Sequence, residues 1–405
     1  MNNRRFRLAV LSPFVDKLHG TERNVAEWIN RLADTFEIHL YSQDVRDIDL
    51  SRITWHKIPK LPGPHLLNYL WWFVANHLWR SWDRRFRNLR PHLIFSPGIN
   101  CLDADVISVH VVFAKYLHQN SRSLRFADHS LSEWPRLIHR KLYYKLVAQL
   151  ERRLYRDPRT QLILISRRTG EALESFYGRH QKFPVVYQGL DHQVFNPERR
   201  LQLRDAVRGE LGFVPGEFVL LLVANDWQNK GLPVLLEVMA RLRDLPMRLL
   251  VVGEDDPSPY REIIEQKFLT GRVDFLPTRP DVEFYYSAAD AYCGPSWEDA
   301  FGQPPAEAMA CGLPIITAVT CGVSELVSSG EDGLVLQDPS DADGLASWIR
   351  QLYQEPAWRD RLGQRAAQKM RQFTWERNGR EMTEILLKAL EKKTSLAGLP
   401  LRQEV

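Results

Sequence analysis

Residues 291–318 read AYCGPSWEDAFGQPPAEAMACGLPIITA, which is the pattern of a strand, a loop, a helix and a second strand. The strands are expected at 291–296 and 313–318. Pro304 and Pro305 suit the first turn of the helix between them, where a missing N–H costs little. Two strands joined through a helix lie parallel in one sheet. The stretch therefore predicts an α/β domain with a parallel sheet.

The same alternation continues along the rest of the chain. Further strands are expected at 7–12, 37–42, 92–96, 105–110, 161–166, 184–188, 218–224, 248–253 and 273–277. Helical spacing separates them, for example at 21–34, 136–153, 231–243 and 376–392. The run FVLLLVA is apolar at every position, as a strand buried on both faces of a parallel sheet must be. The sequence predicts two doubly wound, Rossmann-like domains facing a central cleft.

A polar segment at 191–218 interrupts the series of strands and marks the expected boundary. The length of 405 residues also fits two domains rather than one. We therefore expect an N-terminal domain at 1–190 and a C-terminal domain at 191–375. The last helix, about 376–393, is expected to pack back on the N-terminal domain.

The net charge of +4 conceals a strong asymmetry. Residues 1–190 hold 30 Lys and Arg against 17 Asp and Glu, whereas residues 191–405 hold 24 against 33. The excess is greatest at 51–168, with 21 basic and 7 acidic residues. Such a distribution indicates an anionic partner for the first half of the chain.

Composition excludes several classes of protein. With 44% hydrophobic and 26% charged residues, the chain is neither disordered nor fibrous. Its four cysteines form no CxxC pair, so neither a zinc site nor a disulfide framework is expected. A reducing cytoplasm is the simplest setting for such a chain.

The most apolar stretch, LLNYLWWFVANHLW at 66–79, is shorter than the roughly 20 residues that span a bilayer. The first residues also lack the pattern of a signal peptide. Aromatic and basic residues interleave at 71–90. This pattern suits peripheral contact with the anionic inner face of the cell membrane. The alternative is that the tryptophans are core residues and the arginines a solvated face. No recognition motif for nucleic acid accompanies the charge.

Ligands of such sheets bind beyond the carboxyl ends of strands, often at helix N-termini. Gly20 and Thr21 stand between the first strand and the first helix, where a diphosphate could approach the backbone. The alternative is a loop glycine with an N-cap threonine, and no GxGxxG pattern supports a dinucleotide site. Lys230 follows the strand at 218–224 and can neutralise phosphate charge. The alternative there is a solvated surface lysine.

Asp299 and Glu307 stand eight residues apart around a turn built on Gly302. Asp299 is expected in the loop after a strand and Glu307 in the following helix. Carboxylates in these places can accept hydrogen bonds from the hydroxyls of a sugar or a ribose. The alternative is that Glu307 pairs locally, as most helix glutamates do.

Taken together, three segments carry a family resemblance. AFGQPPAEAMACGLPIIT at 300–317, NDWQNKGL at 225–232 and YQGLDHQVFNPE at 187–198 resemble the family-4 retaining glycosyltransferases of the GT-B fold. The resemblance extends to HGTERNVAEWINRLA at 19–33 and covers nearly the whole chain, more specifically in its C-terminal half.

The resemblance implies a role for each matching residue. Glu307 would bind the ribose hydroxyls, and Asp299, in place of the first Glu of the family's Glu-x7-Glu motif, would contact the donor sugar. Lys230 would bind the donor diphosphate, which the loop at Gly20 and Thr21 would approach. His110 would lie near the sugar and the acceptor, although a buried histidine with a satisfied hydrogen bond is the alternative. The remaining positions implied are Ala300, Phe301, Gly302 and Gln303 at the donor sugar, Thr278 and Arg279 at the base, and Glu325 on the nucleotide side.

Two positions depart from the family pattern. Asn225 stands where the family usually has an arginine, so another cation, such as Arg23 or Arg167, would have to assist Lys230 on the phosphates. Asp299 is one methylene shorter than the usual glutamate, which shortens its reach to a hydroxyl.

The resemblance implies a retaining hexosyltransferase that moves a sugar from a nucleotide-sugar donor, a UDP-sugar first and GDP-mannose second. The acceptor would be a lipid-linked or polysaccharide glycan. No cofactor and no metal are expected, because Asp103-Ala-Asp105 comes before its strand rather than after it. The alternatives are a nucleotide-sugar epimerase of the same fold and a catalytically silent nucleotide-sugar-binding protein.

Overall fold

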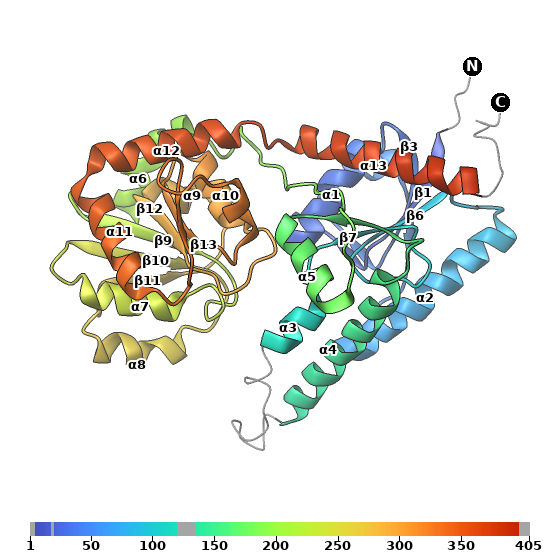
Figure 1. The fold of residues 1–405 in the computed structure, drawn as a ribbon, viewed down its shortest axis with the longest axis horizontal. Helices are drawn as coiled ribbons and strands as arrows, with labels where there is room; N and C mark the ends of the chain where they lie inside the picture. Colours follow the sequence, from blue (N-terminus) through green and yellow to red (C-terminus); the bar gives the residue numbers. More distant parts are fainter. Residues whose placement is uncertain (1–4, 18–19, 120–133, 397–405) are drawn as a thin grey trace. The chain divides into compact units, whose positions relative to one another are not determined.

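The computed structural model describes residues 5–17, 20–119 and 134–396 of the chain (Figure 1). It divides into an N-terminal unit, Met1–Tyr187 with Glu376–Val405, and a C-terminal unit, Gln188–Trp375. The division falls slightly before the boundary expected after residue 190. Each unit is described by itself below.

The N-terminal unit is built on a six-stranded parallel sheet in the order β5-β3-β1-β6-β7-β8. Its strands are β1 (Phe6–Leu11), β3 (Phe36–Ser42), β5 (Thr54–Lys57), β6 (Leu93–Pro97), β7 (Val106–Val109) and β8 (Gln161–Leu164). A short parallel pair, β2 (Phe14–Val15) and β4 (Asp44–Val45), stands apart from it, and η1 (Leu50–Arg52) precedes β5. The helices are α1 (Gly20–Leu32), α2 (His65–Phe86), α3 (Phe113–Gln119), α4 (Trp134–Tyr155), α5 (Arg167–Tyr177) and α13 (Trp375–Leu396).

The last helix belongs to the core of this unit from residue 376 onward. Met382 and Leu386 of α13 are fully buried in one apolar cluster with Leu8 of β1 and Trp28 of α1. Asn378, also buried, accepts a hydrogen bond of 2.6 Å from Trp28 Nε1 and donates one of 2.8 Å to the Tyr187 carbonyl. The helix is therefore fixed to the unit by apolar packing and by a buried polar contact.

The C-terminal unit repeats the plan, with the order β11-β10-β9-β12-β13-β14. Its strands are β9 (Phe218–Val223), β10 (Met247–Val252), β11 (Val273–Leu276), β12 (Ala291–Gly294), β13 (Ile315–Ala318) and β14 (Leu334–Leu336). The helices are α6 (Pro197–Glu210), α7 (Leu232–Arg241), α8 (Ser258–Gln266), α9 (Glu283–Ala288), α10 (Gln303–Ala310), α11 (Ala342–Gln354) and α12 (Pro356–Met370), with η4 (Gly322–Leu326) before β14.

In chain order, both six-stranded sheets read 3-2-1-4-5-6, which is the Rossmann order. The predicted doubly wound class is therefore confirmed for both units. One expected strand is wrong: within 184–188 only Val185 forms an isolated bridge, to Leu164. The strands β5 and β14 were not predicted.

The order reverses between β9 and β12 in the C-terminal unit, and between β1 and β6 in the N-terminal unit. At such a point the connections leave toward opposite faces of the sheet, which opens a crevice at the carboxyl ends of the strands. β9 and β12 pair through Leu220–Ala291 and Leu221–Tyr292, so the loops that follow both strands begin side by side.

Candidate functional site

The loops that follow β9 and β12 bring two opposite charges together. Lys230 Nζ lies 2.6 Å from Asp299 Oδ2, and each side chain is 20% exposed. Asn229, beside the lysine, donates a hydrogen bond of 2.9 Å to the Glu298 carbonyl. The lysine and the aspartate, predicted separately from the sequence, thus lie in contact at the point where the strand order reverses.

A glycine allows these loops to approach each other. Gly231 precedes α7 with φ +89°, and a Cβ built there would lie 2.5 Å from the Pro295 carbonyl oxygen. Both the left-handed backbone and the lack of space exclude other residues. The position of Lys230 therefore depends on the glycine that follows it.

The charge of Lys230 is maintained by its partner. Burial alone would lower the pKa of this lysine, but the charge of Asp299 and their hydrogen bond outweigh it, and the net shift is upward. The side chain is therefore a stable cation at neutral pH, held where the strand ends meet.

Asp299 also organises the loop that leads into α10. Its Oδ1 accepts a hydrogen bond of 3.2 Å from the Phe301 N–H. Gly302 has φ +91°, and a Cβ there would meet Cys321 Sγ at 2.4 Å. Close behind, a Cβ on Gly322 would lie 2.3 Å from the Ala300 carbonyl oxygen. The loop is thus tightly packed against the segment after β13.

Gln303 is the first residue of α10, and its Nε2 donates a hydrogen bond of 3.2 Å to the Gly189 carbonyl. Its Oε1 is buried and has no hydrogen-bond partner among the residues that the structure describes. A buried acceptor without a partner is costly in a folded protein, and it suits a site that receives a hydroxyl donor from a ligand.

Glu307 lies one turn further along α10 and is only 4% exposed. The hydroxyl of Tyr286, from α9, donates a hydrogen bond of 2.9 Å to Glu307 Oε2. Burial, and next the charge of Glu307, raise the pKa of Tyr286 well above its usual range, so this tyrosine remains a donor. The carboxylate is held in place from another helix, a contact that the sequence did not indicate.

The carboxyl ends of β9, β10 and β11 are linked by Glu254. Its backbone N–H donates a hydrogen bond of 3.0 Å to Asn225 Oδ1. Its carboxylate accepts a hydrogen bond of 2.9 Å from the Thr278 N–H and another from the Thr278 hydroxyl. The hydrogen bond from that hydroxyl, together with the backbone contact, holds the pKa of Glu254 below its usual range. Sequence reasoning missed Glu254, although the acidic run Glu254-Asp255-Asp256 directly after a strand was an available signal.

Arg279, next to Thr278, is engaged locally. Its guanidinium contacts both carboxylate oxygens of Asp281, at 3.0 and 2.9 Å, and lies 3.9 Å from the ring centroid of Phe284. This side chain is therefore presented in a fixed orientation beside the Thr278 loop. Glu325 lies in η4, in the segment that packs under the Asp299 loop.

In the N-terminal unit, His110 directly follows β7 and is buried. Its Nε2 lies 3.0 Å from Ser108 Oγ, and its ring centroid lies 5.8 Å from that of Trp28 in α1. Burial lowers the pKa of His110 to about 4, so the ring is neutral at pH 7. Gly20 and Thr21 begin α1, the helix that carries Trp28.

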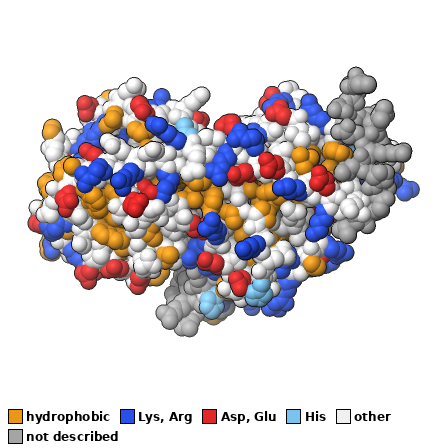
Figure 2. Space-filling view, turned by 45° about the horizontal axis from the view of Figure 1, so that its top comes forward, with side chains coloured by type: hydrophobic (Ala, Val, Ile, Leu, Met, Phe, Trp, Pro, Cys, Tyr) orange, Lys and Arg blue, Asp and Glu red, His pale blue; other side chains and the backbone are white. Residues whose placement is uncertain are grey.

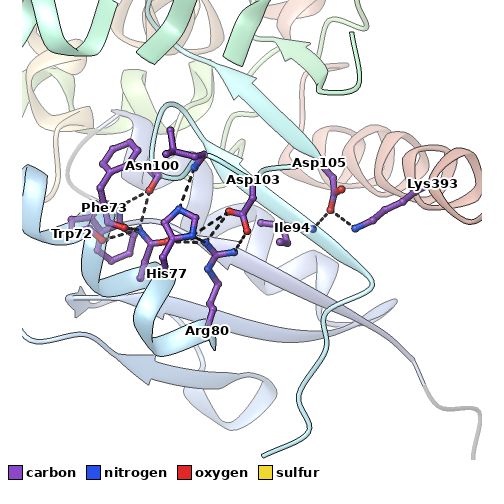
Figure 3. Close-up of polar contacts among 11 residues, drawn as sticks. Trp72, Phe73, His77, Arg80, Ile94, Asn100, Asp103, Asp105 and Lys393 are labelled. Carbon is purple, nitrogen blue, oxygen red and sulfur yellow. Dashed lines mark hydrogen bonds and ion pairs between the residues drawn. The ribbon is translucent and has the colours of Figure 1, made fainter. Parts of the chain in front are cut away.

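The two carboxylates of Asp103-Ala-Asp105 have separate partners (Figure 3). Asp103 accepts two hydrogen bonds of 2.8 Å from Arg80 of α2. Asp105 contacts Lys393 of α13 at 2.7 Å and the Ile94 N–H at 2.8 Å. Within residues 5–17, 20–119 and 134–396, no group of three His, Cys, Asp or Glu side chains could hold a metal ion.

No helix in the described part of the chain is long and apolar enough to cross a membrane. On the face drawn in Figure 2, Lys and Arg side chains are interspersed with Asp and Glu side chains. On that face (Figure 2), the excess of basic residues in the first half of the chain therefore forms no continuous positively charged surface.

Two Rossmann-like units in one chain are the plan of the GT-B fold, and solved structures with this fold match nearly the whole chain. The structure of WaaG, a glycosyltransferase involved in lipopolysaccharide biosynthesis, has a TM-score of 0.74 at 18% identity and covers 94% of this chain and 99% of its own. The structure of Anabaena Alr3699/HepE, solved in complex with UDP and glucose, has a TM-score of 0.68 at 20% identity and covers 95% of this chain and 100% of its own.

Residues 204–369, within the C-terminal unit, match the family described as glycosyl transferases group 1. The D-inositol 3-phosphate glycosyltransferase of Rhodococcus erythropolis is 32% identical over 241 residues, which are 56% of this chain and 53% of that protein. The lipopolysaccharide glucosyltransferase WaaG of Escherichia coli is 27% identical over 228 residues, which are 53% and 60% of the two chains. The chain thus spans little more than half the length of these relatives.

Proposed function

We propose that the protein is a retaining glycosyltransferase that moves a hexose from a nucleotide-sugar to a lipid-linked or polysaccharide glycan. The first choice of donor is a UDP-sugar. The observation that carries this proposal is the Lys230–Asp299 pair at the reversal of strand order. When the bond between sugar and phosphate breaks, negative charge grows on the leaving diphosphate. A preorganised cation in a partly buried site stabilises that charge without reorganisation.

The neighbouring groups suit the rest of a donor. Glu307, held by Tyr286, offers carboxylate oxygens to the ribose hydroxyls, and the loop at Ala300–Gln303 offers backbone N–H groups and the unpartnered Gln303 Oε1 to the sugar. Thr278, held by Glu254, would read the base of the nucleotide, and Asn225, joined to the same glutamate, takes the position of the family's phosphate-binding arginine. Arg279 stands beside Thr278 and would contact the base as well.

The role of the N-terminal unit follows from His110 and from α1. A buried, neutral imidazole at the end of β7 can orient the sugar or the acceptor by hydrogen bonding but is not a general acid at pH 7, because it lacks the imidazolium proton. Gly20 and Thr21 open the helix N-terminus that would approach the diphosphate. We propose that this unit binds the acceptor and that no metal or cofactor takes part. The basic excess of the unit favours an anionic acceptor or membrane.

Relatives support this choice of substrates. The structural relative Alr3699/HepE was solved with UDP and with glucose, which favours a UDP-sugar over GDP-mannose. The curated relatives act on an inositol phosphate and on lipopolysaccharide, and both of these acceptors are anionic.

Thermal-shift measurements with UDP-, GDP-, ADP- and dTDP-sugars test the donor. The protein should be stabilised most by a UDP-sugar, and purified protein should hydrolyse that donor slowly. Lys230→Ala and Glu307→Ala should each lower the hydrolysis strongly, by about 10²-fold or more. Unchanged hydrolysis in both variants contradicts the site. Conversion of the donor to an epimer without acceptor would instead establish the epimerase alternative, and binding without any turnover would establish the silent one.

A further inference from the structure

Helix α2 is apolar on the face that it turns away from its unit. Six large apolar side chains follow one another at intervals of three or four residues, and each is between 42% and 61% exposed: Leu67, Leu70, Val74, Leu78, Trp82 and Phe86. We call this set the α2 face. At 1.5 Å per residue it extends about 28 Å along the helix. A contiguous exposed apolar surface of this kind marks an interaction site on a folded protein.

The opposite side of α2 is fixed to the unit, so this orientation is not accidental (Figure 3). Trp72 and Asn76 donate hydrogen bonds to the Asn100 carbonyl, at 3.0 and 3.2 Å. One turn further on, the buried guanidinium of Arg80 binds Asp103. These contacts hold the helix with the α2 face outward.

The α2 face continues into a groove of about 520 Å³ between the end of α2 and β5. Trp55, Leu78, Trp79 and Trp82 form its apolar lining, and Lys57 and Arg87 stand among the lining residues as cations. His56 and Asp83, both buried, lie 2.8 Å apart in the same lining; burial lowers the pKa of His56, so the neutral ring donates a hydrogen bond from Nδ1 to Asp83 Oδ2. An apolar groove that carries cations suits an amphiphile with an anionic head.

Among the described residues, the exposed charged side chains of α2 and of its neighbour α4 are basic. Over residues 65–86 the only acidic side chain is Asp83, which is buried, while Arg84 and Arg85 are exposed at the C-terminal end. The neighbouring α4, which contacts α2 through His139 and the Leu66 N–H at 3.1 Å, also buries its only acidic residue, Glu151, and exposes Arg and Lys side chains. A second copy of the chain would bring these like charges together, whereas an anionic surface complements them.

We infer that the α2 face and its groove dock the protein on an anionic lipid surface, with α2 lying in the plane of the interface. Leucine, valine and aromatic side chains enter the boundary between headgroups and acyl chains, and arginines remain at the lipid phosphates, as in interfacial helices. The groove receives part of one acyl chain, with Lys57 available to its phosphate and Arg87, which pairs with Asp83 at 3.2 Å, beside it. This inference gives a location to the membrane contact proposed above and is independent of the transfer chemistry.

Co-sedimentation of the full chain with lipid vesicles tests the inference. The protein should bind vesicles of phosphatidylcholine mixed with phosphatidylglycerol and bind phosphatidylcholine alone weakly. Val74→Glu with Leu78→Glu should reduce the binding by at least about tenfold. The matched control is Leu201→Glu with Val214→Glu, which adds the same charge at side chains 61% and 57% exposed in the other unit, and it should bind like the original protein.

Two further measurements keep the result decisive. Arg84→Glu with Arg85→Glu, at exposed positions outside the core, should lower binding even if the first variant fails to fold. Acyl chains carrying bromine should quench tryptophan fluorescence less in Trp82→Phe. Equal vesicle binding by all variants overturns the inference, as does a dimer in solution that Val74→Glu with Leu78→Glu dissociates. Nucleotide-sugar stabilisation should be unchanged in these variants, so failure here is distinguishable from failure of the proposed function.

Discussion

Lys230 and Asp299 come from loops that follow different strands, yet Nζ and Oδ2 lie 2.6 Å apart. The pair sits where β9 and β12 lie side by side and the strand order of the C-terminal unit reverses. Asp299 therefore does two things before any ligand arrives: it fixes the position of the cation and, through Phe301, the loop that precedes α10. Substitution of either residue should therefore alter the position of the other side chain.

Lys230→Ala should lower donor turnover by about 10²- to 10³-fold, as expected when a preorganised group is lost from a developing anion. Asp299→Asn should reduce turnover less, because the lysine remains but loses its charged partner. Steady-state hydrolysis of the nucleotide-sugar measures both effects. Lys267→Ala serves as the control, since Lys267 lies before β11, at the amino ends of the strands. Equal activity of Lys230→Ala and Lys267→Ala would show that Lys230 is not at the phosphates.

Tyr286→Phe leaves the ring in place and removes the hydroxyl, which donates to Glu307 Oε2 at 2.9 Å and also lies 3.2 Å from the Pro304 carbonyl oxygen. The loss of this shared hydrogen bond should cost about 1 kcal/mol of the free energy of unfolding. If Glu307 holds the ribose, affinity for the nucleotide-sugar should also fall about three- to tenfold, because the carboxylate loses its orientation. Calorimetric titration and thermal melting separate the two effects. Ser287→Ala, on the same helix, also loses a hydrogen bond, to the Glu283 carbonyl, and should lower stability alone.

The strands that the sequence predicted correctly are those buried in the sheets, because burial on both faces leaves continuous apolar runs such as 218–223. β5 was missed because it lies at the edge of its sheet and two of its four residues are exposed. The apolar run at 184–188 was misassigned because it pairs only through Val185 before the chain enters the C-terminal unit.

The site shows a similar division. Asp299 and Glu307 could be predicted because both lie in one short segment with a fixed spacing. Glu254 and Tyr286 come from segments distant in sequence, and only the parallel arrangement of strands brings them to Thr278 and Glu307. The ion pair of Lys230 was missed for the same reason, since its partner follows 69 residues later.

Gly231→Ala should lower the free energy of unfolding by at least about 3 kcal/mol, since it adds a clash with Pro295 to the strain of a positive φ. Gly330→Ala is the matched control, because Gly330 has nearly the same φ, +87°, with nothing within 4 Å of the added Cβ. Its cost should be about 1 to 2 kcal/mol. Denaturant unfolding measures both. A similar loss in the two variants would show that the loops after β9 and β12 are not in close contact.

His110 should make stability depend on pH below neutrality. Its pKa is about 4 in the folded protein and about 6.5 when unfolded, so the unfolded chain binds more protons between these values. The contribution is complete above pH 6.5 and is lost as the pH falls toward 4. His110→Gln should therefore reduce the stability difference between pH 7 and pH 4.5 by about 2 kcal/mol, measured by denaturant unfolding. His180→Gln, at a side chain that is 73% exposed, should leave that difference as it was. An unchanged pH dependence in His110→Gln would contradict a buried, neutral imidazole at the end of β7.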